Sequence, residues 1–328
     1  MNSEEGKGIF IISLDYESMW GAIFNKSVEN GYLQRCPYVS ESVKRLLDLF
    51  VKYDIHATWA VVGGIGCDTK EEAYSLSSNK IRDPYSPQTL KEYISSIKNE
   101  EYFFQPELVK RIADTKNQEL ASHTFSHFYF FEHTQPEGKL TEEIEICREL
   151  FKEKFGVEIK TIILPKNQVN SKLFQLLSEN GIDCVRGSQY DNKALKGEKI
   201  FRIINYIDAY IPIYSGYCYP IESMDCGCIV NARASRFWRT YNKKLPFLER
   251  CKLQKVFAEM NYAAKHHQVY HLWFHPHNLS TNIERNFDYI EKILIHYSEL
   301  RRKYDFTSLN MGECTTLVRG MKHDKRNQ

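Results

Sequence analysis

The sequence predicts an α/β protein in which short parallel strands alternate with helices. Apolar runs of strand length recur along the chain, beginning at residues 8–15, and most are followed by apolar residues at helical spacing. Four of these runs end on carboxylates, histidines or amides. Because parallel strands bring their carboxyl ends to one edge, the pattern favours a β/α barrel or an open sheet with one active site there.

Length and composition indicate a globular chain with a large core. With 328 residues, 42% of them hydrophobic, the core could be shared by one large domain or two small ones. We expect a single domain over 1–328, with an insertion at 67–105 and an irregular segment at 193–246. A net charge of +2 creates no general field for nucleic acid, so none is expected as a partner. The basic stretch 319–326 is interpreted as a solvated tail.

The N-terminal residues and the cysteines bear on the cellular compartment. The first residues are polar, and the apolar run at 9–14 is too short for a signal-peptide core or a membrane span. We therefore expect a cytoplasmic protein without a transmembrane segment. Nine cysteines without a paired framework favour reduced thiols. Cys218, Cys226 and Cys228 could bind zinc, but C-x-C chelates poorly and lacks a fourth ligand, so a loop with buried thiols is preferred.

The first predicted strand ends in two acids. Its nearly continuous apolar run at 8–15 is typical of a strand buried on both faces. Strand alternation places Asp15 and Glu17 on one side and Tyr16 opposite. The two acids are therefore candidate site residues, the alternative being a helix-capping or surface pair. The long loop that follows carries Trp20, a candidate substrate contact, because long loops often bear function.

The next elements form a β-α-β unit. Ser40 is expected to cap a helix that runs to about Tyr53, and a strand at 55–62 follows and closes at two glycines. Such a unit requires parallel pairing. Later, Thr141 is expected to cap a helix that Gly156 ends. Further strands are expected at 159–164, 182–185, from 269 and at 306–309, with helices at 106–116, 171–180 and 248–267.

His123 and His127 form the central motif. Four residues is about one helical turn, so a helix beginning at Thr124 would project both imidazoles to one side, as a divalent metal requires. With eleven histidines in the chain, a chance pair is an equal alternative on spacing alone. The other polar strand ends carry Lys166, Asn167 and Gln168, and His275 and His277. Because four predicted strands all end in polar residues, we expect these residues to share one function.

The order of these motifs resembles the polysaccharide deacetylase superfamily. The matching features are an acid after the first strand, H-T-F-S-H at 123–127, P-K-N-Q at 165–168 and W-F-H-P-H at 273–277. The chain is most similar to the intracellular members associated with bacterial surface polysaccharides, over about residues 8–310. The resemblance implies a distorted (β/α)₇ barrel and a mononuclear divalent-metal hydrolase, with zinc the favoured metal, that removes an acyl group from an N-acylated sugar.

The resemblance also implies roles for individual residues. By position, Asp15 matches the catalytic base, His123 and His127 match metal ligands, and His275 matches the general acid. The family usually has T-F-D-D where this chain has L-D-Y-E, so the third ligand is either Glu17 or Asp15 itself, with Glu17 favoured. Lys166 stands where the family commonly has an arginine that orients the base. Candidate substrate contacts are Trp20, Lys166, Asn167, Gln168 and His277.

Three functions follow from these observations. The leading hypothesis is a deacylase that removes acetyl or formyl from a sugar nucleotide or lipid-linked sugar during O-antigen or capsule biosynthesis. A second is a catalytically silent member that keeps the barrel as a carbohydrate-binding module, motivated by Tyr16 in a family metal position. A third is a hydrolase of a non-sugar amide, because the fold alone does not define the substrate.

Overall fold

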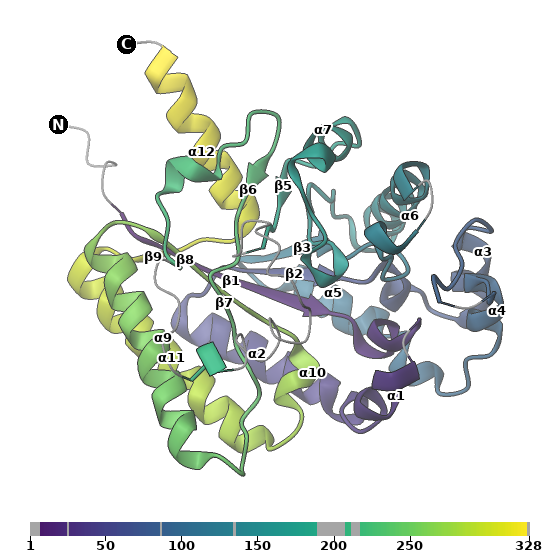
Figure 1. The fold of residues 1–328 in the computed structure, drawn as a ribbon, viewed down its shortest axis with the longest axis horizontal. Helices are drawn as coiled ribbons and strands as arrows, with labels where there is room; N and C mark the ends of the chain where they lie inside the picture. The colour runs from purple at the N-terminus through teal and green to yellow at the C-terminus, as the bar shows by residue number, and fades with distance from the viewer. Residues whose placement is uncertain are drawn as a thin grey trace.

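A parallel sheet forms the centre of the structure, which is a computed structural model (Figure 1). It describes residues 7–24, 26–85, 87–133, 136–188, 207–210 and 217–326. The strands are β1 (Ile9–Tyr16), β2 (Ala57–Val61), β3 (Gln118–Ser122), β4 (Thr161–Ile162), β5 (Cys184–Val185), β6 (Val230–Asn231), β7 (Arg236–Phe237), β8 (Val269–Phe274) and β9 (Thr307–Ser308).

Among the described residues, the named strands pair with one another in parallel, in the order β6-β5-β4-β3-β2-β1-β8-β7, with β9 paired to the start of β1. The sheet curls as an incomplete barrel whose two end strands, β6 and β7, are successive in the chain. The predicted α/β barrel class is therefore confirmed. Parallel pairing brings the carboxyl ends of β1, β3, β4 and β8 to one edge, as we predicted for the four strands that end in polar residues.

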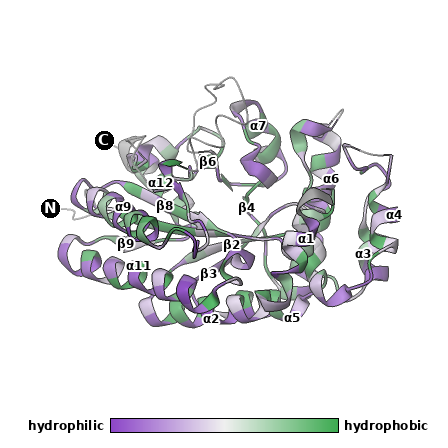
Figure 2. Ribbon diagram, turned by 60° about the horizontal axis from the view of Figure 1, so that its bottom comes forward, coloured by the Kyte–Doolittle hydropathy of each residue, from purple (hydrophilic) through white to green (hydrophobic). Residues whose placement is uncertain are grey.

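Helices cover the outside of this sheet. They are α1 (Lys26–Leu33), α2 (Val39–Tyr53), α3 (Lys70–Leu76), α4 (Leu90–Ser95), α5 (Pro106–Asp114), α6 (Pro136–Phe155), α7 (Ser171–Glu179), α9 (Pro246–Lys265), α10 (Pro276–Leu279), α11 (Ile283–Tyr304) and α12 (Met311–Arg326). In Figure 2, α11, α2 and α5 lie in a row and alternate hydrophilic and hydrophobic residues. This alternation is typical of helices that bury one face against a sheet.

Helix α2 illustrates how spacing produces packing. Its stripe of Val43, Leu46, Leu47 and Phe50 is at most 2% exposed. Each such side chain contributes about 1.5–3 kcal/mol on burial, so the stripe fixes the helix to the sheet. The helix ends at Asp54, whose left-handed backbone (φ 52°) turns the chain directly into β2.

Two predicted helix starts are wrong. Helix α6 begins at Pro136, so Thr141 lies inside the helix rather than capping it. Proline is favoured in the first helical turn, where a missing N–H costs nothing, and that signal outweighs the threonine. Helix α2 begins at Val39, one residue before the predicted cap Ser40. The predicted end of α6 is confirmed, because Gly156 follows it with φ +68°.

The predicted insertion and irregular segment have different outcomes. Residues 67–105 contain α3, α4 and a short 3-10 turn, and the domain limits stay a prediction. In the segment 193–246, residues 193–206 and 211–216 lie outside the described residues. Its described end, 217–246, is not simply irregular, because it supplies β6 and β7. Each strand has only two residues, which is too short for a periodicity to be recognised.

The basic stretch 319–326 is helical rather than an irregular tail. It forms the last part of α12, where Arg319 pairs with Asp183 at 2.8 Å and Lys322 pairs with Asp225 at 2.7 Å. The sequence shows the basic charges of this stretch but not the acidic partners, Asp183 and Asp225, which are distant in the chain.

Glu119 in β3 joins this last helix to the sheet. Its carboxylate accepts hydrogen bonds from Thr58 Oγ1 at 2.6 Å, Thr161 Oγ1 at 2.5 Å and the Gly312 N–H at 3.0 Å. Thr58 and Thr161 are at most 1% exposed. We expect Glu119→Ala to lower the free energy of unfolding by about 2–4 kcal/mol, because it leaves buried donors without an acceptor.

Urea denaturation of the wild type and Glu119→Ala checks this expectation. The matched control is Glu284→Ala, which removes an exposed carboxylate paired with Arg45 at 2.7 Å. The control should leave the stability nearly unchanged, because solvent screens an exposed ion pair. Equal effects of the two substitutions would contradict the assignment of Glu119 as a structural link.

Candidate active site

The carboxyl edge of the sheet brings together one carboxylate and three imidazoles. Glu17 follows β1, His127 follows β3 by five residues, and His275 follows β8 directly. Glu17 Oε1 lies 3.3 Å from Nε2 of His123 and 3.2 Å from Nε2 of both His127 and His275. Glu17 is 4% exposed, so this meeting point is shielded from bulk water.

Strand alternation operates at the end of β1 as predicted. The Asp15 carboxylate lies on the same side as Glu17, with Oδ2 3.9 Å from His275 Nε2. Tyr16 is wholly buried, and its hydroxyl donates to Gln105 Oε1 at 2.5 Å, away from the histidines. Tyr16 therefore does not occupy the position where a metal ligand would be needed.

The backbone that carries His123 and His127 is not the predicted helix. Residues 123–128 form a loop in which Thr124 (φ 63°) and His127 (φ 61°) have left-handed conformations. Glu143 of α6 holds this loop by accepting from the Ser126 N–H at 2.7 Å and the Ser126 hydroxyl at 2.9 Å. The two imidazoles still converge, with ring centroids 5.2 Å apart.

The protonation of His123 follows from its partners. Its Nδ1 lies 2.7 Å from the carbonyl oxygen of Ile163, so Nδ1 must carry the hydrogen and donate it. Nε2 then presents a lone pair toward Glu17. Burial acts to raise the pKa of Glu17, but the nearby His275 and His127 imidazoles outweigh it and hold that pKa well below its ordinary value.

These donors fit a divalent metal ion. Ligand atoms of Glu17, His123 and His127 all lie within 4.8 Å of one another. Ligands about 2.0–2.2 Å from a tetrahedral zinc ion are about 3.3–3.6 Å from each other, close to the separations of 3.2 and 3.3 Å found here. An anionic oxygen facing the lone pair of His123 requires a cation or a proton between them, and a metal satisfies both groups.

Asp15 is held by a residue that the sequence reasoning missed. Arg186 is 0% exposed and donates from Nη1 and Nη2 to the two Asp15 oxygens, each at 2.7 Å. It also donates to Ser13 Oγ at 2.8 Å and to Asn167 Oδ1 at 2.8 and 3.0 Å. Burial acts to raise the pKa of Asp15, but the adjacent Arg186 guanidinium lowers it below its ordinary value. A signal existed, because Arg186 directly follows the predicted strand 182–185.

Lys166 does not have the role that the resemblance implied. It has a left-handed backbone (φ 57°), is 42% exposed at its side chain and pairs with Glu132 at 2.7 Å. Its ammonium lies 3.7 Å from the Tyr129 ring centroid. Arg186, not Lys166, makes the contacts that orient Asp15, with the fork that lysine lacks.

The other predicted substrate contacts differ in exposure: one is buried in the core and two are partly exposed. Trp20 is 0% exposed and donates its indole N–H to the Phe103 carbonyl at 2.9 Å, so it is a core residue and this prediction is wrong. Gln168 is partly exposed and donates to Glu132 at 2.5 Å, which fixes the loop after β4. Asn167, also partly exposed, supports Arg186.

The orientation of His275 is set by a chain of hydrogen bonds. Arg35 Nη1 donates to Asn278 Oδ1 at 3.2 Å, and Asn278 Nδ2 lies 3.2 Å from His275 Nδ1. Because arginine only donates, the Asn278 oxygen must face Arg35 and its NH₂ must face His275. His275 Nδ1 is then an acceptor, and the imidazole proton is on Nε2, toward Glu17.

The pKa values of His275 and its neighbour His277 shift in opposite directions. Burial lowers the pKa of His275, but the charge of Glu17 outweighs it and the pKa is raised. His277 is 3% exposed, its Nδ1 has no partner among the described residues, and burial lowers its pKa to about 3. His277 is therefore neutral, with its ring 4.6 Å from that of Tyr32.

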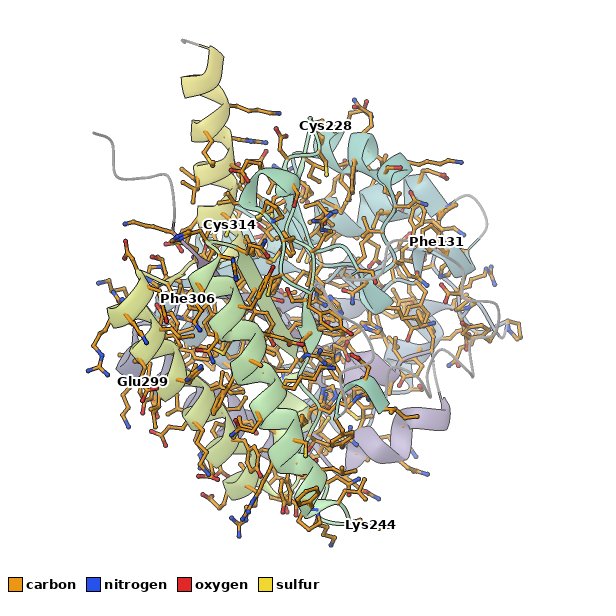
Figure 3. All side chains as sticks on the ribbon, turned by 60° about the vertical axis from the view of Figure 1, so that its left-hand side comes forward. Phe131, Cys228, Lys244, Glu299, Phe306 and Cys314 are labelled. Carbon is orange, nitrogen blue, oxygen red and sulfur yellow. The ribbon has the colours of Figure 1, made fainter. Side chains whose placement is uncertain are left out.

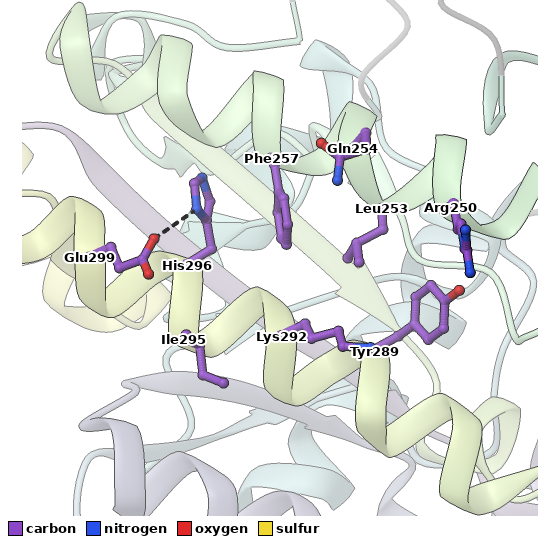
Figure 4. A pocket seen from close by; sticks show the side chains of 9 residues that line it. All are labelled: Arg250, Leu253, Gln254, Phe257, Tyr289, Lys292, Ile295, His296 and Glu299. Atoms are coloured by element: carbon purple, nitrogen blue, oxygen red, sulfur yellow. Dashed lines mark ion pairs between the residues drawn. The ribbon is translucent and has the colours of Figure 1, made fainter.

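Two other regions do not contribute to this site. Cys228 is exposed at the surface (Figure 3), and Cys218 and Cys226 are partly buried, so the expectation of buried thiols is wrong. The metal-ligand groups found among the described residues do not include them. A groove of about 420 Å³ lies between α9 and α11 (Figure 4), but none of its nine lining residues belongs to the site.

Fold and site together define a class of protein: a curled parallel β/α barrel with a histidine–carboxylate centre at its carboxyl edge. Residues 27–185 match the family model for polysaccharide deacetylase. These residues carry a domain of the polysaccharide deacetylase family. This is a family of carbohydrate deacetylases, hydrolases of amides that generally depend on a metal.

One solved structure shares this fold. A candidate polysaccharide deacetylase from Mycobacterium smegmatis has a TM-score of 0.63 at 15% identity, covering 98% of this chain and 94% of that one. A carbohydrate esterase family 4 pseudoenzyme from Bacillus anthracis has a TM-score of 0.46 at 11% identity, covering 94% and 66%. A family 4 carbohydrate esterase from Streptomyces lividans has 0.42 at 10%, covering 90% of each chain.

Two comparisons are negative. No curated protein matches the sequence significantly. Among the described residues, no helix combines the length and the apolar character needed to cross a bilayer.

Proposed function

We propose that this protein is a zinc-dependent deacylase that removes an acetyl or formyl group from the nitrogen of an N-acylated sugar. The observation that carries the proposal is the meeting of Glu17 Oε1 with three imidazole nitrogens at 3.2–3.3 Å, beside an acid clamped by arginine. A metal-dependent amide hydrolase needs a Lewis acid, a base and an acid around one carbonyl, and this cluster offers ligands for the first and residues for the other two.

In this proposal Glu17, His123 and His127 hold the metal. A bound metal would act as a Lewis acid, polarising the amide carbonyl and lowering the pKa of water. Glu17 is preferred to Asp15 as the third ligand, because both Asp15 oxygens accept from Arg186 whereas Glu17 Oε1 faces the histidines. Tyr16, which motivated the silent binding module, points away from the site.

Asp15 and His275 act as the base and the acid. Arg186 keeps Asp15 ionised and fixes its plane, so the carboxylate is prepared to accept the proton of the attacking water. His275 can act as the acid in its imidazolium form, which the neighbouring Glu17 and Asp15 carboxylates favour by raising its pKa, and it can then give the Nε2 proton to the departing amine. Asp15 Oδ2 and His275 Nε2 are 3.9 Å apart, so the proposed base and acid lie at the same place in the site.

The proposal also covers the class of substrate and the compartment of the reaction. We propose a sugar nucleotide or lipid-linked sugar of bacterial O-antigen or capsule biosynthesis, modified in the cytoplasm before export. All nine cysteine thiols are unpaired, which supports a reducing compartment. Lys166 and Gln168 at the exposed rim after β4, together with Asn167 and His277, are the proposed sugar contacts.

The metal content of the purified protein tests the proposal. We expect near-stoichiometric zinc, or another divalent ion, in the wild type after purification without chelator. Glu17→Ala and His127→Ala should both lose it, because each removes one of three ligands. Mass spectrometry gives the metal-to-protein ratio directly.

The matched controls are Glu284→Ala and His296→Ala, which remove the same side-chain types from outside the site. Both should keep the metal content of the wild type. A wild type that holds no metal, even after reloading, would favour the silent carbohydrate-binding module instead.

A further inference from the structure

The two oxygens of Glu17 have different surroundings. Oε1 faces the three imidazoles, whereas Oε2 accepts a hydrogen bond from the Tyr32 hydroxyl of α1 at 2.6 Å. Glu17 lies beyond the end of β1, and the left-handed residue Ser18 (φ 46°) turns the chain immediately after it. The strand therefore does not fix this side chain, and other contacts must do so.

Gly21 provides the space for that contact. A Cβ atom at this position would come closer than 3.0 Å to both Glu17 Oε2 and the Tyr32 hydroxyl oxygen, a separation that real Cβ contacts do not show. Glycine is required here by the approach of two polar side chains rather than by backbone conformation. The turn after β1 is thus shaped around the Glu17 carboxylate.

We propose that Tyr32, with the space left by Gly21, is a positioning residue that presents Glu17 to the metal through a single oxygen. This inference rests on the proposed function. A glutamate has one more rotatable bond than an aspartate, and ordering it upon metal binding costs conformational entropy. The Tyr32 hydroxyl removes that cost by holding the carboxylate in advance and keeps Oε2 away from the metal.

The consequence for the site is an open coordination position. Three protein ligands and one free position are typical of catalytic zinc, whereas a carboxylate bound through both oxygens would fill more of the shell. Partners of this kind, one step removed from the ligands, usually contribute 10- to 100-fold to metal affinity. The Tyr32 ring also packs 4.6 Å from the His277 ring, so the hydroxyl can be removed without removing the packing.

Zinc affinity, measured by competition with a chromophoric chelator, tests the inference. Tyr32→Phe should bind zinc about 10- to 100-fold more weakly than the wild type. The matched control is Tyr53→Phe, which removes a tyrosine hydroxyl that donates to a glutamate, Glu291, at 2.9 Å but outside the site. The control should stay within about twofold of the wild type.

A second readout separates positioning from general structure. The visible absorption of bound Co²⁺ reports the coordination number, and we expect it to change in Tyr32→Phe and not in Tyr53→Phe. The melting temperature of metal-free Tyr32→Phe should stay close to that of the metal-free wild type. Unchanged zinc affinity and an unchanged cobalt spectrum in Tyr32→Phe would overturn the inference.

Gly21→Ala provides an independent variant, compared with Gly31→Ala in α1, where an added Cβ meets nothing within 4 Å. Gly21→Ala should weaken zinc binding at least as much as Tyr32→Phe, and Gly31→Ala should not. If Gly21→Ala fails to fold, Tyr32→Phe still decides. A wild type that binds no zinc refutes the proposed function, whereas a wild type and Tyr32→Phe that bind equally well refute only this inference.

Discussion

Asp15→Asn should lower kcat for acetate or formate release from an N-acylated sugar by about 10²–10⁴-fold, the usual contribution of a general base. The asparagine amide has nearly the shape of the carboxylate but cannot accept a proton at neutral pH. Arg186 can still donate to the remaining oxygen, so the side chain should stay in place. The assay compares N-acetylated and N-formylated sugars, nucleotide-linked and lipid-linked, and quantifies the released acid.

The metal separates this effect from collapse of the site. Because Asp15 faces Arg186 and not the lone pairs of His123 and His127, Asp15→Asn should keep near-wild-type zinc. His123→Ala should lose both zinc and activity. Robust turnover by both variants would refute the proposed mechanism, and loss of zinc in Asp15→Asn would make Asp15 rather than Glu17 the third ligand.

Arg186→Met should lower the free energy of unfolding by about 3–5 kcal/mol, the usual cost of leaving a buried charge without its partner. The guanidinium is 0% exposed and Asp15 is 3% exposed, so water cannot replace the lost hydrogen bonds. Arg186→Lys should lose less stability, because it keeps the charge and gives up only the two-pronged contact. Urea denaturation gives the midpoint and slope for each variant.

Two controls define the effect of Arg186. Arg319→Met removes an arginine–aspartate pair at 2.8 Å whose arginine side chain is 50% exposed, and it should cost less than about 1 kcal/mol. The double variant Asp15→Asn/Arg186→Met should be less destabilised than the sum of the two single variants, since it leaves neither charge unpaired. A loss below about 1 kcal/mol in Arg186→Met would contradict a structural role for the pair.

Together these variants test whether the two neighbouring acids, Glu17 and Asp15, have different functions. Glu17 should govern metal content, with Tyr32 as its support, whereas Asp15 should govern turnover, with Arg186 as its support. The distinction depends on which oxygens face which partners, because the two carboxylates lie on the same side of one strand end. A single substitution in each acid is enough to separate the two roles.

Much of the site was predictable because it depends on local periodicity. Alternation along β1 separates Asp15 and Glu17 from Tyr16, and this follows from strand geometry alone. The ends of parallel strands meet at one edge whatever the details of the loops, so the grouping of Glu17 with His123, His127 and His275 was also predictable.

Other features depended on partners distant in the sequence. The alternating strands and helices, the polar strand ends and the H-T-F-S-H motif could be predicted, because these are short-range patterns. The tertiary contacts were needed to show that Glu143 shapes the histidine loop, that Arg186 rather than Lys166 holds Asp15, and that Tyr32 holds Glu17. Arg186 and Asp15 are 171 residues apart, and the curvature of the sheet, not any local pattern, sets their distance.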